Sequence, residues 1–108
     1  MYEDLDPATV ARRLKETPTS VVLLDVREPF ERSLAAIEPS LHIPMNDVPG
    51  RIAEIPRDRQ VVVYCHTGGR SMMVASYLLG EGFPSVANLA GGIDAWSRRV
   101  DPSIPRYT

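Results

Sequence analysis

The segment from Tyr64 to Ser71, Tyr-Cys-His-Thr-Gly-Gly-Arg-Ser, combines a nucleophile, two glycines and a cation within a few residues. It contains the chain's single cysteine, Cys65, directly after the strand-forming run Val61-Val62-Val63-Tyr64. In parallel α/β folds, ligands bind in the crevice outside the carboxyl ends of the strands, and the end of such a strand places Cys65 there. We therefore expect the Cys65 thiol to be the nucleophile of a binding crevice.

The residues after Cys65 favour a loop that holds negative charge. Gly68 and Gly69 let the backbone take conformations closed to other residues. We expect the N–H groups from His66 to Ser71 to turn inward as an anion-binding nest, with a helix that begins near Ser71 directing its positive end at the same point. Both effects stabilise a thiolate relative to a thiol, so the sequence predicts an ionised, reactive Cys65 at neutral pH.

These residues also have plainer interpretations. A lone cysteine at the end of an apolar strand is usually a buried, inert side chain, although an inert cysteine has no use for a nest. Arg70 is either a cation that completes the pocket or a helix N-terminal side chain paired with a carboxylate such as Asp25. His66 and Thr67 either line the mouth of the pocket at Cys65, chiefly through their backbone N–H groups, or are loop residues whose side chains are simply exposed.

The length of the loop separates two chemistries. Cysteine enzymes that handle phosphate use a C-x5-R loop, whose larger ring surrounds a tetrahedral group, whereas four residues separate Cys65 from Arg70 here. The shorter loop forms a tighter ring around Cys65, and a tighter ring suits a single small atom bound to the Cys65 sulfur. A cysteine-dependent phosphatase or arsenate reductase is the alternative that this spacing disfavours, and dithiol chemistry is excluded by the single cysteine.

Composition limits the class of protein further. We place one domain over residues 1–108, because the length and the 44% of hydrophobic residues are typical of one globular unit. A net charge of −2 gives no basic surplus for nucleic acid or an anionic membrane. One cysteine and two histidines are too few for a typical structural zinc site. An acidic N-terminus and a lone cysteine lead us to expect a cytoplasmic protein.

Periodicity and helix signals predict the elements that position the loop. Asp6 and Pro7 are typical of a helix N-terminus, and this helix is expected to run to about Glu16. Further helices are expected over residues 28–36, behind Asn46 and Asp47 to about Ile55, over 71–79, and after Gly91-Gly92. Strands are expected at 21–24, 41–43, 61–64 and 86–89. This alternation predicts an α/β fold with a mostly parallel central sheet flanked by helices on both faces, and an extended tail from Asp101 to Thr108 lying along the body.

With these motifs the chain resembles the rhodanese family of sulfurtransferases over nearly its whole length, and its single-domain members most closely. The residues that carry the resemblance are Val22 to Glu28, His42-Ile43-Pro44, Cys65 to Ser71, and Asn88 to Trp96.

The resemblance implies a double displacement on Cys65 without metal or organic cofactor. The thiolate would take the outer sulfur of a donor such as thiosulfate, and the resulting persulfide would be held by the N–H groups from His66 to Ser71. Cyanide or a thiol, on a small molecule or on an acceptor protein, would then remove that sulfur. Asp25 and Arg27, which match the family's motif, either support the loop or form a structural ion pair. A non-catalytic binding or sensing module on the same fold is the other alternative.

Overall fold

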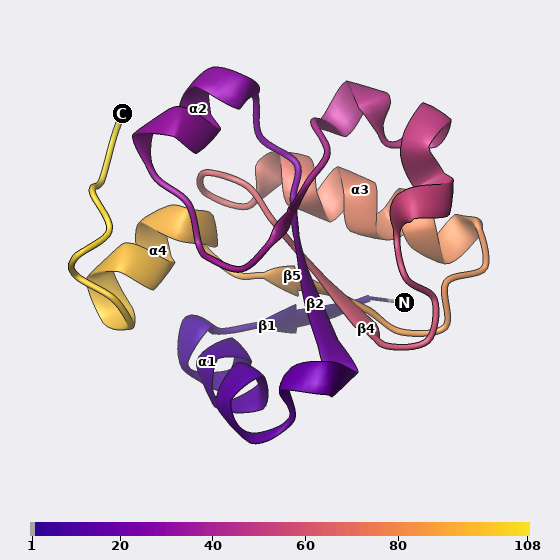
Figure 1. Cartoon of the computed structure of the whole chain (residues 1–108), viewed down its shortest axis with the longest axis horizontal. Coiled ribbons are helices and arrows are strands. Elements are labelled where there is room, and N and C mark those ends of the chain that lie inside the picture. The colour runs from indigo at the N-terminus through magenta and orange to yellow at the C-terminus, as the bar shows by residue number, and fades with distance from the viewer. Residues whose placement is uncertain (1) are drawn as a thin grey trace.

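A sheet of five parallel strands lies at the centre of the computed structural model, which describes residues 2–108 (Figure 1). The strands, in the order in which they lie side by side, are β1 (Glu3–Leu5), β5 (Val86–Leu89), β4 (Gln60–Tyr64), β2 (Val21–Asp25) and β3 (Leu41–His42). The predicted α/β fold is confirmed, and the sheet is parallel throughout. The middle position of β4 puts the residue that follows it, Cys65, at the centre of the sheet's carboxyl edge.

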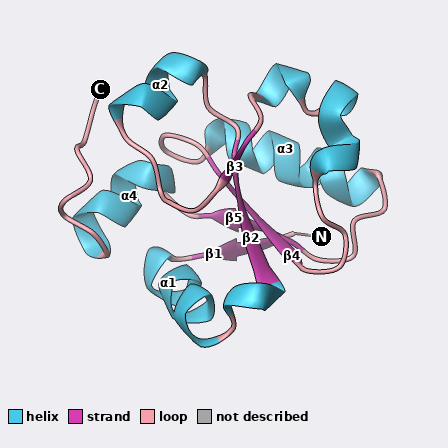
Figure 2. Ribbon diagram, in the orientation of Figure 1, coloured by secondary structure: helices cyan, strands magenta, loops and turns pink. Residues whose placement is uncertain are grey.

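Over residues 2–108, four α-helices and three short 3-10 helices cover the sheet (Figure 2). The α-helices are α1 (Pro7–Glu16), α2 (Pro29–Leu34), α3 (Gly69–Gly80) and α4 (Gly92–Arg99). The 3-10 helices span Pro18–Ser20, Met45–Asp47 and Pro49–Glu54. Within the described part of the chain, each helix is too short or too polar to cross a bilayer.

Side chains alternate between the two faces of the sheet, and each face has its own core. Val61 and Val63 of β4 pack in the cluster that includes Val74 and Leu78 of α3, and Cys65 belongs to this cluster. Val62 and Tyr64 pack in the other cluster, with residues of α1 and α4. The period of two along β4 therefore directs Cys65 toward α3 and Tyr64 toward the opposite face.

Several predicted boundaries hold and others are wrong. Helix α1 begins as expected, because the Asp6 carboxylate accepts a hydrogen bond of 2.8 Å from the backbone N–H of Thr9. Strand β1 was not predicted, since it is a three-residue edge strand with two exposed side chains. Helix α2 ends at Leu34 rather than near residue 36, because Ala35 is extended and its carbonyl accepts a hydrogen bond of 2.7 Å from Arg27.

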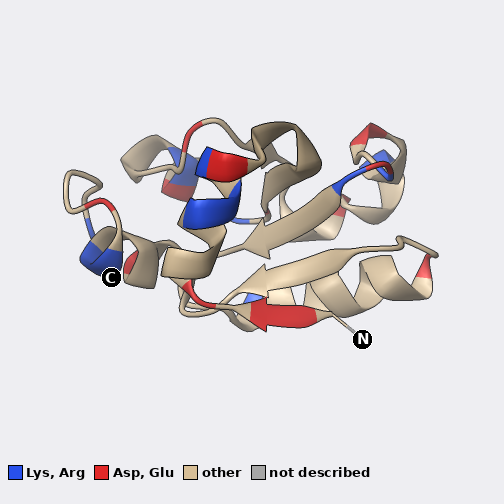
Figure 3. Cartoon of the chain, turned by 90° about the horizontal axis from the view of Figure 1, so that it is seen from below, with Lys and Arg blue, Asp and Glu red and all other residues tan. Residues whose placement is uncertain are grey.

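The expected helix behind Asn46 and Asp47 is instead the pair of 3-10 helices, and neither side chain caps it. Pro49 begins the second of them, and proline supplies no N–H to a continuous helical ladder. Helix α3 begins at Gly69, two residues before the predicted start at Ser71, because Gly68 is already its N-cap. Over the fold as a whole, acidic and basic residues are interspersed and do not form separate patches of one charge (Figure 3).

The start of α4 packs directly against the strand-to-loop junction. The N–H of Ile93 donates to the Cys65 carbonyl at 2.9 Å, and the N–H of Asp94 donates to the His66 carbonyl at 3.1 Å. Gly92, the residue before Ile93, has φ of +62°. A Cβ on Gly92 would collide with the carbonyl oxygens of Cys65 and His66. The first turn of α4 therefore fixes the two peptide groups that follow the nucleophile.

We predict that Gly92→Ala lowers the free energy of unfolding by more than about 2 kcal/mol, because it adds a backbone collision to an unfavourable positive φ. Urea denaturation measures the change. Gly50→Ala is the matched control, since a Cβ there meets nothing within 4 Å. Equal stability of the two variants would show that the close approach at Gly92 is unimportant.

Candidate functional site

The loop after β4 turns hydrogen-bond donors toward the Cys65 sulfur. Sγ accepts from the backbone N–H of Gly68 at 3.1 Å and from that of Ser71 at 3.4 Å. The side chain is 1% exposed, so these groups take the place of water around the sulfur. The sequence predicts inward N–H groups from His66 to Ser71. Among them, the N–H groups of Gly68 and Ser71 donate to the sulfur. The loop thus presents main-chain N–H groups as hydrogen-bond donors to the sulfur.

The conformation of the loop depends on Gly68. Its φ of +119° lies in the left-handed region, and it is the N-cap of α3. Gly69, the other loop glycine, is the first residue of α3. The first N–H groups of a helix have no acceptor within it and carry the positive end of its dipole. These donors therefore lie beside the nucleophile, as the sequence predicts.

The Ser71 hydroxyl joins Cys65 to the sheet. Ser71 Oγ lies 3.4 Å from Cys65 Sγ, and it is a donor to Asn88 Oδ1 at 2.5 Å and to the Gly68 carbonyl at 3.1 Å. Asn88 Nδ2 in turn donates to Asp4 at 2.9 Å. A hydroxyl has one proton and two lone pairs, so Ser71, whose proton points to Asn88 and the Gly68 carbonyl, presents a lone pair to Cys65 Sγ.

Asp25 and Arg27 form a fully buried ion pair at the end of β2, next to the loop. Arg27 donates to both carboxylate oxygens, at 2.9 and 2.7 Å, and Arg32 and Tyr64 each donate at 3.1 Å. Burial alone would raise the pKa of Asp25, but the hydrogen bonds from Arg27 outweigh it and the pKa is lowered. The geometry is that of a structural ion pair whose polar atoms are satisfied.

Arg70 pairs with a carboxylate, but the suggestion of Asp25 as its partner is wrong. Its two terminal nitrogens donate to the two oxygens of Glu31, on α2, at 2.6 and 2.9 Å. Asp25 is already bound by Arg27 and Arg32. The hydrogen bonds from Arg70 lower the pKa of Glu31 to about 2. The Arg70 side chain stays 32% exposed, so the ion pair lies at the rim of the site.

His66 and Thr67 line a surface cavity of about 520 Å³ together with residues of α4 and the tail. The other lining residues are Asp94, Arg106, Tyr107 and Thr108. The Tyr107 ring stacks on the His66 ring, with centroids 4.0 Å apart and planes inclined by 12°. The extended tail thus lies along the body, as predicted, and it covers one side of the loop.

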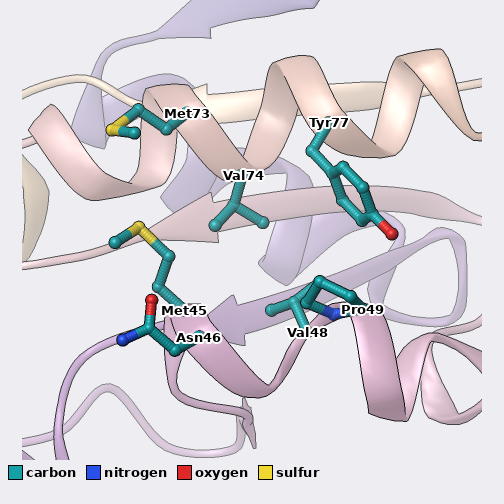
Figure 4. A pocket seen from close by; sticks show the side chains of 7 residues that line it. All are labelled: Met45, Asn46, Val48, Pro49, Met73, Val74 and Tyr77. Atoms are coloured by element: carbon teal, nitrogen blue, oxygen red, sulfur yellow. The ribbon is translucent and has the colours of Figure 1, made fainter.

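A second hollow, of about 210 Å³, lies between α3 and the 3-10 helices (Figure 4). Its lining residues are Met45, Asn46, Val48, Pro49, Met73, Val74 and Tyr77. They include no cysteine, histidine or charged side chain, so this hollow brings no reactive group to the site. Over residues 2–108, no group of three His, Cys, Asp or Glu side chains is placed to hold a metal ion.

Sequence reasoning did not identify Glu31, Asn88 or Tyr107 as part of the site. Two of them carried a signal. Glu31 stands three residues after Glu28 in a capping box, and Asn88 is a polar residue within a fully buried strand. Tyr107 lies in a tail without periodicity, and its position depends on contacts with residues far away in the sequence.

The structure combines a parallel α/β sheet with a cysteine in an amide-lined loop after its central strand, at the edge of the sheet where ligands bind in parallel α/β folds. The family model of the rhodanese-like domain matches residues 6–99. The chain therefore belongs to the rhodanese-like domain family, and the resemblance noted in the sequence is confirmed.

Known relatives match most of the chain. It is 40% identical over 104 residues to a sulfurtransferase of Allochromatium vinosum, with 96% of each chain covered. It is 38% identical over 93 residues to the thiosulfate sulfurtransferase GlpE of Pseudomonas paraeruginosa, covering 86% of this chain and 82% of that one. The crystal structure of a rhodanese-related protein from Thermoplasma volcanium superposes with a TM-score of 0.85 at 27% identity, covering 98% of this chain and all of that one.

We predict that Ser71→Ala slows alkylation of Cys65 by iodoacetamide at pH 7 by about tenfold, because losing the hydroxyl bonds to Asn88 and the Gly68 carbonyl loosens the loop that turns its N–H groups toward the sulfur. Ser33→Ala is the control, since the Ser33 hydroxyl bonds the Phe30 carbonyl on the exposed side of α2. A rate at pH 7 equal to that of the unchanged protein would contradict the role of Ser71.

The ion pair at Glu31 predicts a loss of stability in acid. The folded protein holds the pKa of Glu31 at about 2, below its usual value of 4.5, so the carboxylate stabilises the fold above that value and this contribution disappears as the pH falls toward 2. Between pH 5 and 2, the free energy of unfolding should fall by roughly 3 kcal/mol more in the unchanged protein than in Glu31→Gln. Denaturation at each pH measures it, with Glu16→Gln on the exposed end of α1 as control. Parallel pH profiles for all three proteins would refute the prediction.

Proposed function

We propose that this chain is a sulfurtransferase that moves a sulfane sulfur from a donor such as thiosulfate to cyanide or a thiol, through a persulfide on Cys65. The observation that carries the proposal is the orientation of the loop, whose Gly68 and Ser71 N–H groups meet the sulfur of the chain's one cysteine. Further support comes from relatives that are themselves sulfurtransferases, one of them a thiosulfate sulfurtransferase.

In the first half-reaction, the Cys65 thiolate attacks the outer sulfur of thiosulfate. A bond forms between Sγ and that sulfur, the sulfur–sulfur bond of the donor breaks, and sulfite leaves with the electron pair. The product is a persulfide that stays negatively charged. The N–H groups of the loop and of the first turn of α3 stabilise this charge without changing position, because they are fixed before the donor arrives.

In the second half-reaction, a nucleophile attacks the terminal sulfur of the persulfide. If the nucleophile is cyanide, the product is thiocyanate. If it is the thiolate of a small molecule or of an acceptor protein, that thiolate becomes a persulfide. In both cases the electron pair of the broken bond returns to Cys65 as the thiolate. The chain has no second cysteine that could take the sulfur, so the acceptor comes from outside it. Kinetics of the ping-pong type follow from the two steps.

The other site residues have supporting roles in this proposal. His66 to Ser71 bind the transferred sulfur and the donor, chiefly through main-chain groups, while Asp25 and Arg27 hold the end of β2 beside the loop. The satisfied hydrogen bonds of that ion pair favour structural support over contact with substrate. We also place the reaction in the cytoplasm, because a lone cysteine suits a reducing compartment.

The arrangement of Arg70 disfavours phosphate chemistry. An arginine that recognises a phosphoryl group does so by turning its guanidinium fork toward the oxygens of that group. Here both terminal nitrogens of Arg70 are bound to Glu31, at 2.6 and 2.9 Å. A four-residue spacing between Cys65 and Arg70 also leaves a smaller ring than the phosphatase loop. A terminal sulfur atom is therefore the better fit.

We predict that incubation with thiosulfate adds one sulfur atom to the protein, that cyanide then removes it, and that Cys65→Ser takes up none. Intact-mass spectrometry before and after each step measures the change, and thiocyanate release measures turnover. Hydrolysis of p-nitrophenyl phosphate is assayed in parallel. Turnover retained in Cys65→Ser, or phosphate hydrolysis lost with Cys65 in place of sulfur uptake, would refute the proposed function.

A further inference from the structure

The large apolar side chains that are exposed within residues 2–108 gather on two helices, α2 and α3. They are Phe30, Leu34, Met72, Met73 and Tyr77. Phe30 is 66% exposed and Met73 is 65% exposed. Single exposed apolar residues are common on soluble proteins, whereas a group of them on neighbouring elements marks an interaction site. These five residues are called the α2–α3 surface below.

The α2–α3 surface lies beside the loop that holds Cys65. Arg70, near the start of α3, is bound to Glu31 on α2, so the two helices meet at the rim of the site (Figure 1). Phe30 directly precedes Glu31, and Met72 lies in the first turn of α3, the turn that donates an N–H to the Cys65 sulfur. Exposed apolar side chains therefore flank the rim on both helices.

The hollow between α3 and the 3-10 helices extends this surface inward. Met73 and Tyr77 on α3 face Met45 across it, with Val74 between them (Figure 4). Val74 and Cys65 belong to the same core cluster, so the hollow lies on the face of the sheet toward which Cys65 is directed. Its volume of about 210 Å³ exceeds the roughly 150 Å³ of an apolar cavity that binds benzene. An aliphatic or aromatic side chain therefore fits it, whereas its uncharged lining offers nothing to a small anion.

Methionine makes this surface adaptable. The three methionines in the described part of the chain are Met45, Met72 and Met73, and each lies on the α2–α3 surface or lines the hollow. Methionine is unbranched and its thioether is polarizable, so it packs against apolar groups of different shapes. A surface of this kind suits a polypeptide partner, whose side chains vary in shape.

The proposed reaction brings such a partner to this place. The chain has one cysteine, so the transferred sulfur leaves on an acceptor from outside. Because Cys65 is almost completely buried, the thiol of a polypeptide reaches a persulfide there only when its neighbouring side chains lie against the rim of the loop. On the side of α2 and α3 the rim is apolar, and the charges of Arg70 and Glu31 neutralise each other. The matching partner is apolar around its thiol.

We propose that the α2–α3 surface, with the adjoining hollow, is the docking site for a polypeptide acceptor whose cysteine is flanked by apolar side chains. This inference rests on the proposed sulfurtransferase function. The acceptor thiolate attacks the terminal sulfur of the Cys65 persulfide, the bond between that sulfur and Sγ breaks, and its electron pair returns to Cys65. The acceptor leaves as a persulfide, and the apolar contacts determine which thiols react fast.

Two synthetic peptides test the proposal, one with a cysteine between two leucines and one with a cysteine between two serines. The protein is loaded with sulfur from thiosulfate and freed of the donor, and intact-mass spectrometry follows the loss of that sulfur to each peptide. Per thiolate, we expect the leucine peptide to react about tenfold faster, because its side chains leave water on docking. High salt leaves this ratio of rates in place, since ions screen charges and not apolar contacts.

Met73→Gln removes an apolar side chain from the surface at an exposed position of α3. We expect it to lower the leucine-to-serine ratio of rates by about threefold. Phe30→Gln, on the other helix, is the second variant and is expected to lower the same ratio if Met73→Gln does not fold. Ala8→Gln is the matched control, because Ala8 is an exposed residue of α1, which packs in the cluster on the opposite face of the sheet.

Two results would overturn the proposal directly. One is equal rates for the two peptides with the unchanged protein, and the other is a ratio in folded Met73→Gln that matches the ratio in Ala8→Gln. A second copy of this chain is the competing occupant, and sedimentation velocity tests it. A dimer of the unchanged protein that is lost in Met73→Gln would also overturn the proposal, since the surface would then be covered by the partner copy.

The outcomes separate this proposal from the proposed function. If the unchanged protein takes up no sulfur from thiosulfate, the function fails, and the docking site for a sulfur acceptor fails with it. If the protein takes up sulfur and releases it to cyanide while the two peptides react equally fast, the function stands and the docking proposal alone is overturned.

Discussion

The Cys65 sulfur is almost completely buried, and main-chain N–H groups take the place of water around it. This arrangement governs the neighbouring backbone. Gly68 takes a left-handed conformation that no β-branched residue adopts readily, and α3 starts at once so that its unpaired N–H groups face the sulfur. Gly92 lets α4 approach closely enough to fix the peptide groups of Cys65 and His66 from behind.

The parts of this arrangement that depend on local sequence were predictable. The run Val61-Val62-Val63 fills both faces of a buried strand, and the Gly-Gly pair after Cys65 indicates a backbone turn. Strand β1 could not be recognised, because three residues at a sheet edge with Glu3 and Asp4 exposed carry no periodic signal. The helix expected behind Asn46 failed for a similar reason, since apolar spacing does not distinguish an α-helix from two 3-10 turns around Pro49.

The partner of Arg70 lay outside what the sequence indicates. Glu31 and Asp25 are both acidic and both near the loop, and only the path of the chain decides between them. Arg27 curls back onto Asp25, two residues before it, and occupies both carboxylate oxygens. Its remaining donors go to the Ala35 carbonyl and to Tyr107, so the buried charge is fully satisfied and α2 is held against the end of β2. Glu31 then faces the loop and takes Arg70.

This division between main chain and side chains separates chemistry from selectivity. The donors around the sulfur are mostly backbone N–H groups, and the side chains of His66 and Thr67 can change without removing them. The side chains that line the mouth come from α4, the tail and the loop itself. In the proposed sulfurtransferase, segments that lie far apart in sequence would therefore shape the approach to the site, while the strand-to-loop junction would hold the sulfur. Substitutions at the rim would then leave the main-chain contacts of Cys65 in place, because those contacts come from Gly68 and Ser71.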